Sequence, residues 1–192
     1  QEIGAANTLY TDNTGTWWAT NTDASAAVEA IALGLLPEGA PAEPDPRLLE
    51  GKRVLLIGAG GVARAIGWAC VRAGAAVTVT NRTSARGKEL AERLGCQFAS
   101  WENRGTSFSD VVVNCTPLGM KGFPSQLPID PEVFHPGQVA MDVIYNPERT
   151  PFLTEAEARG CKIIPGREML IYQAMDAFEA WTGQRPPYEI LA

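Results

Sequence analysis

A glycine-rich turn between an apolar run and a helical segment limits what this chain can fold into. Residues 58–63 read Gly-Ala-Gly-Gly-Val-Ala and directly follow the apolar run Val54–Ile57. This order predicts a strand that turns through glycines into a helix, where Gly60 lets a ligand approach the backbone and Ala63 packs closely on the strand. Helix amino termini bind anions, so the turn predicts a dinucleotide pyrophosphate site, although an ordinary strand-to-helix turn also uses glycine. The expected cofactor contacts are Gly58, Ala59, Gly60, Gly61 and Val62.

A polar cluster follows the next predicted strand, 76–80, where cofactor selectivity is usually set. Its candidate phosphate ligands are Asn81, Arg82, Thr83 and Arg86. An NAD site places a carboxylate here for the ribose hydroxyls, whereas a 2′-phosphate favours guanidinium groups and hydroxyls. The alternative is that Thr83 or Ser84 only caps helix 85–94 and that the arginines are solvated surface charges. Because the cluster comes one strand after the glycine turn, we expect the cofactor to be NADP.

Strands and helices alternate along most of the chain. Strands are expected at 54–57, 76–80, 97–98, 110–114, 139–144 and 162–164, and helices at 24–36, 62–72 and 85–94. Apolar strands separated by helices predict an α/β fold with a Rossmann-like, doubly wound parallel sheet. Residues 3–10 and 17–20 predict a hairpin before it, and four prolines mark 37–51 as a loop.

Composition narrows the classes of partner. The net charge is −6 and no block of lysine and arginine is present, which argues against binding to nucleic acid or a membrane surface. The four cysteines lack metal-ligand spacing, so we expect free thiols, no metal site and a cytoplasmic location. His135 lies in a Phe-His-Pro-Gly turn and is interpreted as a turn residue.

Several further segments together resemble the shikimate dehydrogenase family, which interconverts 3-dehydroshikimate and shikimate with NADP. The segments are 3–9, 21–23, 58–63, 81–83, 114–120, 142–145, 169–170, 173–174 and 178–183, in the family's order. The resemblance is closest to the dehydrogenase half of proteins fused to a dehydroquinate dehydratase. It implies a small-molecule substrate, shikimate or 3-dehydroshikimate, and leaves a homodimer possible.

The resemblance also implies roles for individual residues. Asn7, Tyr145 and Gln173 match substrate-binding positions, Asp23 matches the catalytic, substrate-binding aspartate, and Thr116, Val143 and Gly166 match positions near the cofactor. For Asp23 the residues alone favour an ordinary helix N-cap. Gln173 lies beside an apolar stripe at helical spacing that includes Leu170 and Trp181, so its amide needs a partner. A backbone group could serve, whereas the resemblance implies a substrate hydroxyl.

The family's proton-transferring lysine precedes the segment that matches residues 3–9. Of the lysines present, Lys121 alone is expected near the ligand edge of the sheet. We therefore expect a fragment, with residues 1–23 as the remnant of a substrate domain and 24–192 as the NADP domain with its returning helix. Two alternatives remain, a quinate/shikimate dehydrogenase and an NADP-binding module without catalysis.

Overall fold

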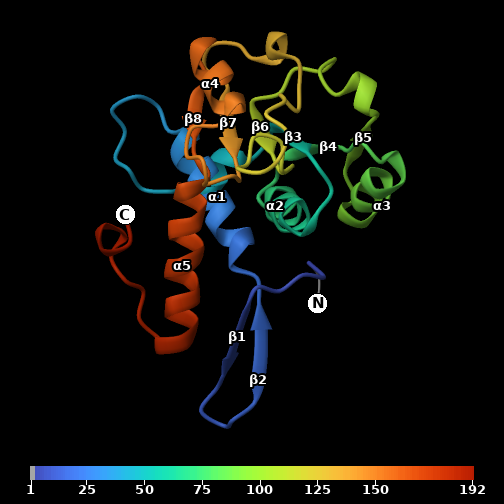
Figure 1. Ribbon diagram of the computed structural model, residues 1–192. Helices are drawn as coiled ribbons and strands as arrows, with labels where there is room; N and C mark the ends of the chain where they lie inside the picture. The colour runs from blue at the N-terminus through green and yellow to red at the C-terminus, as the bar shows by residue number, and fades with distance from the viewer. Residues whose placement is uncertain (1–2) are drawn as a thin grey trace.

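A parallel sheet forms the centre of the computed structural model, which describes residues 3–192 (Figure 1). Its strands are β3 (Arg53–Ile57), β4 (Ala76–Thr80), β5 (Gln97–Ala99), β6 (Val111–Asn114), β7 (Val139–Asp142) and β8 (Lys162–Ile164). They lie in the order β5-β4-β3-β6-β7-β8. The chain reverses direction across the sheet between β3 and β6, and ligands of doubly wound folds bind outside the carboxyl ends of the strands at such a switch point. The predicted fold class is confirmed.

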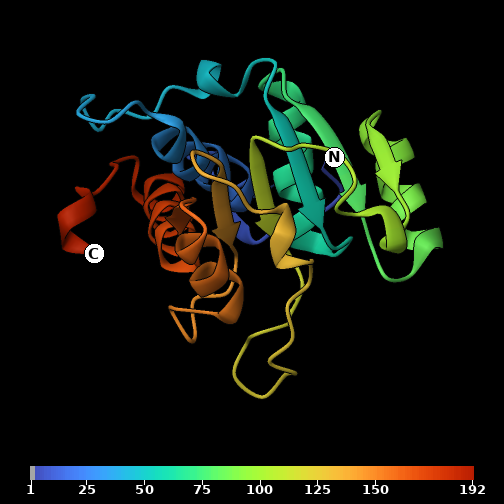
Figure 2. The same cartoon turned by 90° about the horizontal axis from the view of Figure 1, so that it is seen from above.

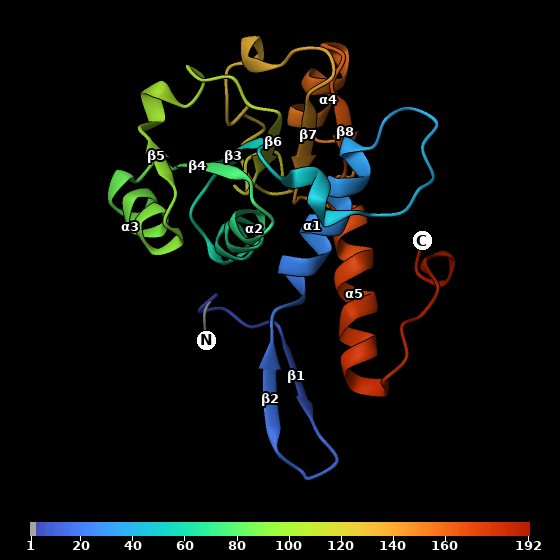
Figure 3. The same cartoon turned by 180° about the vertical axis from the view of Figure 1, so that it is seen from behind.

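Helices cover both faces of the sheet. They are α1 (Thr22–Leu35), α2 (Gly61–Arg72), α3 (Ser84–Leu94), α4 (Pro151–Ala158) and α5 (Gly166–Thr182), with 3-10 turns η1 (Pro46–Leu49), η2 (Trp101–Asn103), η3 (Pro131–Val133) and η4 (Tyr188–Ile190). Helices α1 and α5 lie side by side, as Figure 3 shows from behind. Seen from above in Figure 2, the loop that follows β6 projects away from the body of the molecule.

Alternating side chains of the central strands supply two cores, because successive residues of a strand point to opposite faces. Val54 and Leu56 of β3 belong to the core under α1 and α2. Leu55 and Ile57 belong to the core that Phe152 of α4 closes on the other face. The sheet is therefore buried on both sides, which leaves its strand ends as the place for function.

The hairpin projects from the rest of the molecule and consists of β1 (Thr8–Thr11) and β2 (Trp17–Thr20) (Figure 1). The expected first strand, 3–10, starts too early, because residues 3–7 are not in a strand. Trp17 is 72% exposed on the hairpin, and Trp181 of α5 donates its indole N–H to the Leu9 carbonyl at 2.9 Å. This bond ties the hairpin to the end of α5.

Other boundaries also differ from expectation. Strand β7 ends at Asp142 rather than at 144, and the loop 37–51 contains the turn η1. The proposed domain boundary at 23/24 falls within the first turn of α1, and the division into domains stays a prediction. The cysteines are free thiols, as expected. Among residues 3–192, no helix combines the length and the apolar character needed to cross a bilayer.

Candidate functional site

The glycine turn follows β3, at the point between β3 and β6 where the order of the strands along the sheet reverses. Gly58 has a φ of +122° and donates its N–H to the Thr80 carbonyl at 2.8 Å. A Cβ at Gly58 would stand 2.9 Å from the Cys115 carbonyl oxygen, so only glycine lets the loops after β3 and β6 approach this closely. The predicted tight turn is confirmed, and it brings together the carboxyl ends of β3, β4 and β6.

The start of α2 is open toward this edge. Gly60 is the N-cap of the helix. In the described part of the chain, no side chain caps the first N–H groups, and a Cβ at either Gly60 or Gly61 would meet nothing within 4 Å. Val62 is half-buried and Ala63 fully buried, so these two residues pack the helix on the sheet. Uncapped N–H groups beside open space are what a phosphate group requires, so these residues fit a dinucleotide.

A cavity of about 250 Å³ joins the glycine turn to α3. Ala59 and Arg86 both line it. Arg82 is exposed just before α3, while the Asn81 side-chain amide donates to the Thr83 carbonyl at 2.9 Å. Thr83 is the N-cap of α3 but its side chain makes no capping bond, so the capping interpretation is wrong for this hydroxyl. One residue of each predicted cofactor motif therefore lines the same cavity, and the rest of its lining is Arg64, Glu89, Leu90 and Arg93.

A second cavity of about 470 Å³ lies between the loops that follow β6 and β7. Its lining includes Thr116, Lys121, Val143 and Tyr145. The Lys121 N–H donates to the Asn146 carbonyl at 3.2 Å, which joins the two loops directly. Lys121 is thus at the ligand edge, as the sequence predicts.

Gly166 allows α5 to begin directly against the loop after β7. A Cβ at this position would stand 2.5 Å from the carbonyl carbon and oxygen of Ile144 and 2.7 Å from the carbonyl carbon of Val143. Val143 and Gly166 therefore lie close together through backbone contact, and their place beside a nicotinamide stays a prediction.

A buried polar network supports both loops, and sequence reasoning missed it. Asn114 and Asp142, both fully buried, are direct partners across β6 and β7. The Asn114 amide donates to both oxygens of Asp142 at 3.2 Å, and the Thr150 hydroxyl donates to Oδ2 of Asp142 at 2.6 Å. The sequence does hold a signal for this network, because the apolar strands β6 and β7 each end in a polar residue, Asn114 and Asp142.

Burial raises the pKa of the Asp142 carboxyl from 3.8 to about 6, although bonds from Thr150, Ile144 and Asn114 offset part of this effect. Between about pH 4 and pH 6 the folded chain then holds a proton that the unfolded chain has lost, so this group's contribution to stability falls as the pH rises. We expect the stability advantage of the wild type over Asp142→Asn to shrink by about 2 kcal/mol between roughly pH 4.5 and pH 7.5. Urea unfolding at both pH values tests this, and a difference that does not change with pH would contradict it.

A third group of polar side chains lies where the hairpin meets α1 and α5. Oδ1 of Asn7 accepts the Thr22 N–H at 2.9 Å, and the Thr22 hydroxyl donates to Oε1 of Gln173 at 3.4 Å. Burial raises the pKa of the half-buried Asp23, and a bond from Asn7 opposes this shift. The structure therefore brings Asn7, Asp23 and Gln173 together around Thr22.

One expectation about this group is wrong. The N-cap of α1 is Asn21, which accepts the Ala24 N–H at 3.2 Å, so Asp23 lies in the first turn and does not cap the helix. The apolar stripe beside Gln173 is partly exposed, since Leu170 is 40% and Trp181 62% exposed. The Gln173 amide has a backbone partner, because it donates to the Leu170 carbonyl at 3.2 Å.

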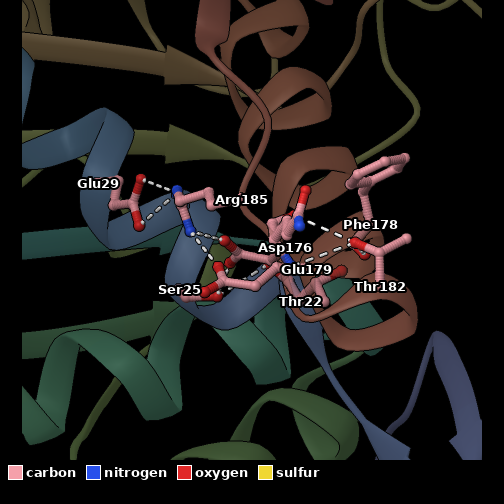
Figure 4. Close-up of polar contacts among 9 residues, drawn as sticks. Thr22, Ser25, Glu29, Asp176, Phe178, Glu179, Thr182 and Arg185 are labelled. Atoms are coloured by element: carbon pink, nitrogen blue, oxygen red, sulfur yellow. Dashed lines mark hydrogen bonds and ion pairs between the residues drawn. The ribbon is translucent and has the colours of Figure 1, made fainter.

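An ionic cluster holds α1 against α5 beside these residues. Figure 4 shows Arg185 between Glu29 of α1 and Asp176 of α5. Arg185 donates to both oxygens of Glu29, at 2.8 and 3.0 Å, and Ser25 donates to Asp176. The cluster fixes the two helices that carry Asp23 and Gln173.

Comparison with known proteins agrees with this geometry. Residues 42–117 match the family described as Shikimate / quinate 5-dehydrogenase, and residues 166–191 match the Shikimate 5'-dehydrogenase C-terminal domain. The NADP(+) shikimate dehydrogenase of Methanocella arvoryzae is 38% identical over 196 residues, which cover 99% of this chain and 67% of that protein. The chain belongs to the shikimate dehydrogenase family.

The chain spans a different share of each family member that it matches. The shikimate dehydrogenase (NADP(+)) of Archaeoglobus fulgidus is 41% identical over 153 residues, which cover 74% of this chain. The chain spans 55% of that relative and 67% of the Methanocella one. The shikimate dehydrogenase family therefore contains proteins longer than this sequence.

Solved structures of the shikimate dehydrogenase family share the fold. Shikimate 5-dehydrogenase from Thermus thermophilus, in complex with NADP(H) and shikimate, gives a TM-score of 0.83 at 36% identity and covers all of this chain and 67% of its own. Quinate dehydrogenase from Corynebacterium glutamicum, in complex with NAD, gives a TM-score of 0.84 at 30% identity, covering 99% and 67%.

Proposed function

We propose that the chain is the NADP-binding part of an NADP-dependent shikimate dehydrogenase, an oxidoreductase that interconverts 3-dehydroshikimate and shikimate by reversible hydride transfer. The observation that carries the proposal is the cavity beside the open start of α2, which Ala59 of the glycine turn and Arg86 of α3 both line. The names of the relatives agree with it, since they are NADP(+) shikimate dehydrogenases.

The adenosine end of the cofactor would lie over α2 and α3. The N–H groups at Gly61 and Val62 bind the pyrophosphate, because neither has a capping side chain. Asn81, Arg82, Thr83 and Arg86 hold the 2′-phosphate, which suits the absence of a carboxylate at residues 81–83.

The nicotinamide end would enter the cavity between the loops after β6 and β7, near Thr116, Val143 and Gly166. Bound NADP supplies the hydride acceptor there. Helix α5 runs from this cavity to Gln173, seven residues or about 10 Å along its axis from Gly166. Asn7, Asp23, Tyr145 and Gln173 bind the hydroxyl groups of the substrate, and the Asp23 carboxylate orients the hydroxyl that reacts.

The first test combines two measurements on one sample of the chain. NADP is titrated by calorimetry, and NADPH formation is followed by absorbance with shikimate and, separately, with quinate. Binding of NADP supports the cofactor proposal, and turnover with shikimate supports the complete activity. Binding without turnover would favour an NADP-binding module for this length of chain, whereas turnover with quinate and NAD alone would favour a quinate dehydrogenase. A folded chain that binds no NADP would overturn the proposal.

Arg82 is expected to select NADP over NAD. The side chain is exposed and has no hydrogen bond or ion pair to another described residue, so it is free to bind a phosphate group. Replacing Arg82 with alanine should weaken NADP binding by about 10-fold to 100-fold, the size of one or two charge-assisted hydrogen bonds, and NAD binding little. Calorimetry measures both affinities. Arg159→Ala, at the exposed end of α4 on the opposite face of the sheet, is the control. Equal weakening of NADP and NAD would rule out the phosphate role.

A further inference from the structure

The Asp142 carboxylate lies behind the cavity between the loops after β6 and β7, and donors surround it. It accepts the Asn114 amide, the Thr150 hydroxyl at 2.6 Å and the Ile144 N–H at 3.0 Å. Asp142 is 0% exposed, so no ligand in the cavity can touch it. Any influence on a ligand has to pass through these three partners.

Two of the partners lead directly to the cavity wall. Oδ1 of Asn114 accepts both the N–H of Thr116 at 3.0 Å and its hydroxyl at 2.7 Å. On the other loop, the bond to the Ile144 N–H fixes the residue between Val143 and Tyr145. Thr116, Val143 and Tyr145 all line the cavity, so one carboxylate restrains both of its sides.

The third partner reaches a helix on the far side of the loop. Thr150 is the N-cap of α4, and its hydroxyl oxygen also accepts the Leu153 N–H at 3.3 Å. The loop of residues 143–149 is therefore held at both ends by Asp142, at its start through Ile144 and at its finish through Thr150. A buried carboxylate is costly unless donors surround it, and an apolar side chain in its place would leave these donors unpaired.

We propose that Asp142 is a positioning residue that shapes the cavity for the nicotinamide end of the cofactor through Asn114, Ile144 and Thr150. The proposal rests on the proposed function, because it takes this cavity as the nicotinamide site. It assigns Asp142 no contact with cofactor or substrate. The three hydrogen-bond partners of Asp142 are Asn114, Ile144 and Thr150, and none of them belongs to the glycine turn, so a change at Asp142 should act on the nicotinamide end of the cofactor first.

The test compares two ligands that differ only in the nicotinamide ring. Calorimetry on the full chain measures the affinity for NADPH and for 2′-phospho-ADP-ribose, which lacks the ring. We expect the wild type to bind NADPH about tenfold more tightly, the size of one well-made contact. In Asp142→Asn this ratio should fall to about one while the affinity for 2′-phospho-ADP-ribose is unchanged, because an amide cannot accept from all three partners.

Two sets of variants serve as controls. Asp110→Asn makes the same chemical change at the residue before β6, where the carboxylate accepts the Arg53 N–H at 2.7 Å, and it should leave the ratio at its wild-type value. Thr150→Val removes one donor to Asp142 and should lower the ratio of the two affinities. Thr150→Ser keeps the hydroxyl and should leave the ratio at its wild-type value. This pair tests the network if Asp142→Asn fails to fold.

The outcomes separate the two proposals. A folded wild type that does not bind 2′-phospho-ADP-ribose overturns the proposed function itself. A wild type that binds both ligands equally overturns the positioning role, and so does a variant with an unchanged ratio. An equal loss of affinity for both ligands would show that Asp142 supports the fold alone.

Discussion

Replacing Gly60 with alanine is expected to remove most of the affinity for NADP while the stability of the fold stays nearly unchanged. The stability should hold because a Cβ at Gly60 meets no atom of the described residues within 4 Å, and the φ of −87° is open to any residue. Alanine is a poorer N-cap than glycine but restricts the unfolded chain more, so the net change should stay within about 1 kcal/mol.

The affinity should fall because the new methyl group fills the space in front of the first N–H groups of α2. A pyrophosphate held there would have to move by about the radius of a methyl group, which lengthens several hydrogen bonds at once. We expect NADP binding to weaken at least about 30-fold, or roughly 2 kcal/mol.

Calorimetry with two ligands distinguishes this effect from a general disturbance of the site. Adenosine 2′-phosphate has no pyrophosphate, so its affinity should be unchanged in Gly60→Ala and should fall in Arg82→Ala. Urea unfolding of the same samples checks the fold. Unchanged NADP affinity in Gly60→Ala would place the pyrophosphate elsewhere.

The sequence was most informative where local pattern and tertiary structure agree. The predicted ranges of β4 and β8, 76–80 and 162–164, are confirmed. Short apolar runs bounded by turn residues are typical of buried strands, and the sheet buries these runs as strands. The strand-turn-helix at Gly58 was predicted for the same reason. Helix α4 was not predicted, because it has only eight residues. Its three buried residues, Phe152, Leu153 and Ala156, are too few to show a helical period in the sequence.

The parts of the site that depend on contacts between distant segments could not be predicted. Asp142 and Asn114 are 28 positions apart, and only the register of β6 with β7 makes them partners. The same network explains the early end of β7, because Asp142 takes the N–H of Ile144 and turns the chain. Asn21 was missed as the N-cap because Asp23 has an equally favourable residue type, and local sequence does not rank them.

Gly166 illustrates this limit and leads to the largest effect on stability that we expect. It begins α5 as Gly61 begins α2, so the two glycines occupy equivalent positions in their helices. Their surroundings are opposite. A Cβ at Gly61 would meet open space, whereas at Gly166 it would stand 2.5 Å from the backbone of Ile144.

Replacing Gly166 with alanine should therefore lower the free energy of unfolding by about 3 kcal/mol or more, because backbone atoms cannot rotate away from the new methyl group. The midpoint of thermal unfolding should fall by roughly 6 to 12 °C for a chain of this size. Gly61→Ala is the matched control and should change stability by less than about 1 kcal/mol, since the substitution is equivalent but causes no clash. Calorimetric unfolding of both variants measures the difference.

The clash also requires α5 to move away from Val143 in any Gly166→Ala protein that folds, so the preference for NADPH over 2′-phospho-ADP-ribose should be lost. Two variants of equal stability would mean that α5 can move at little cost, and α5 would then not fix the distance between the nicotinamide cavity and Gln173.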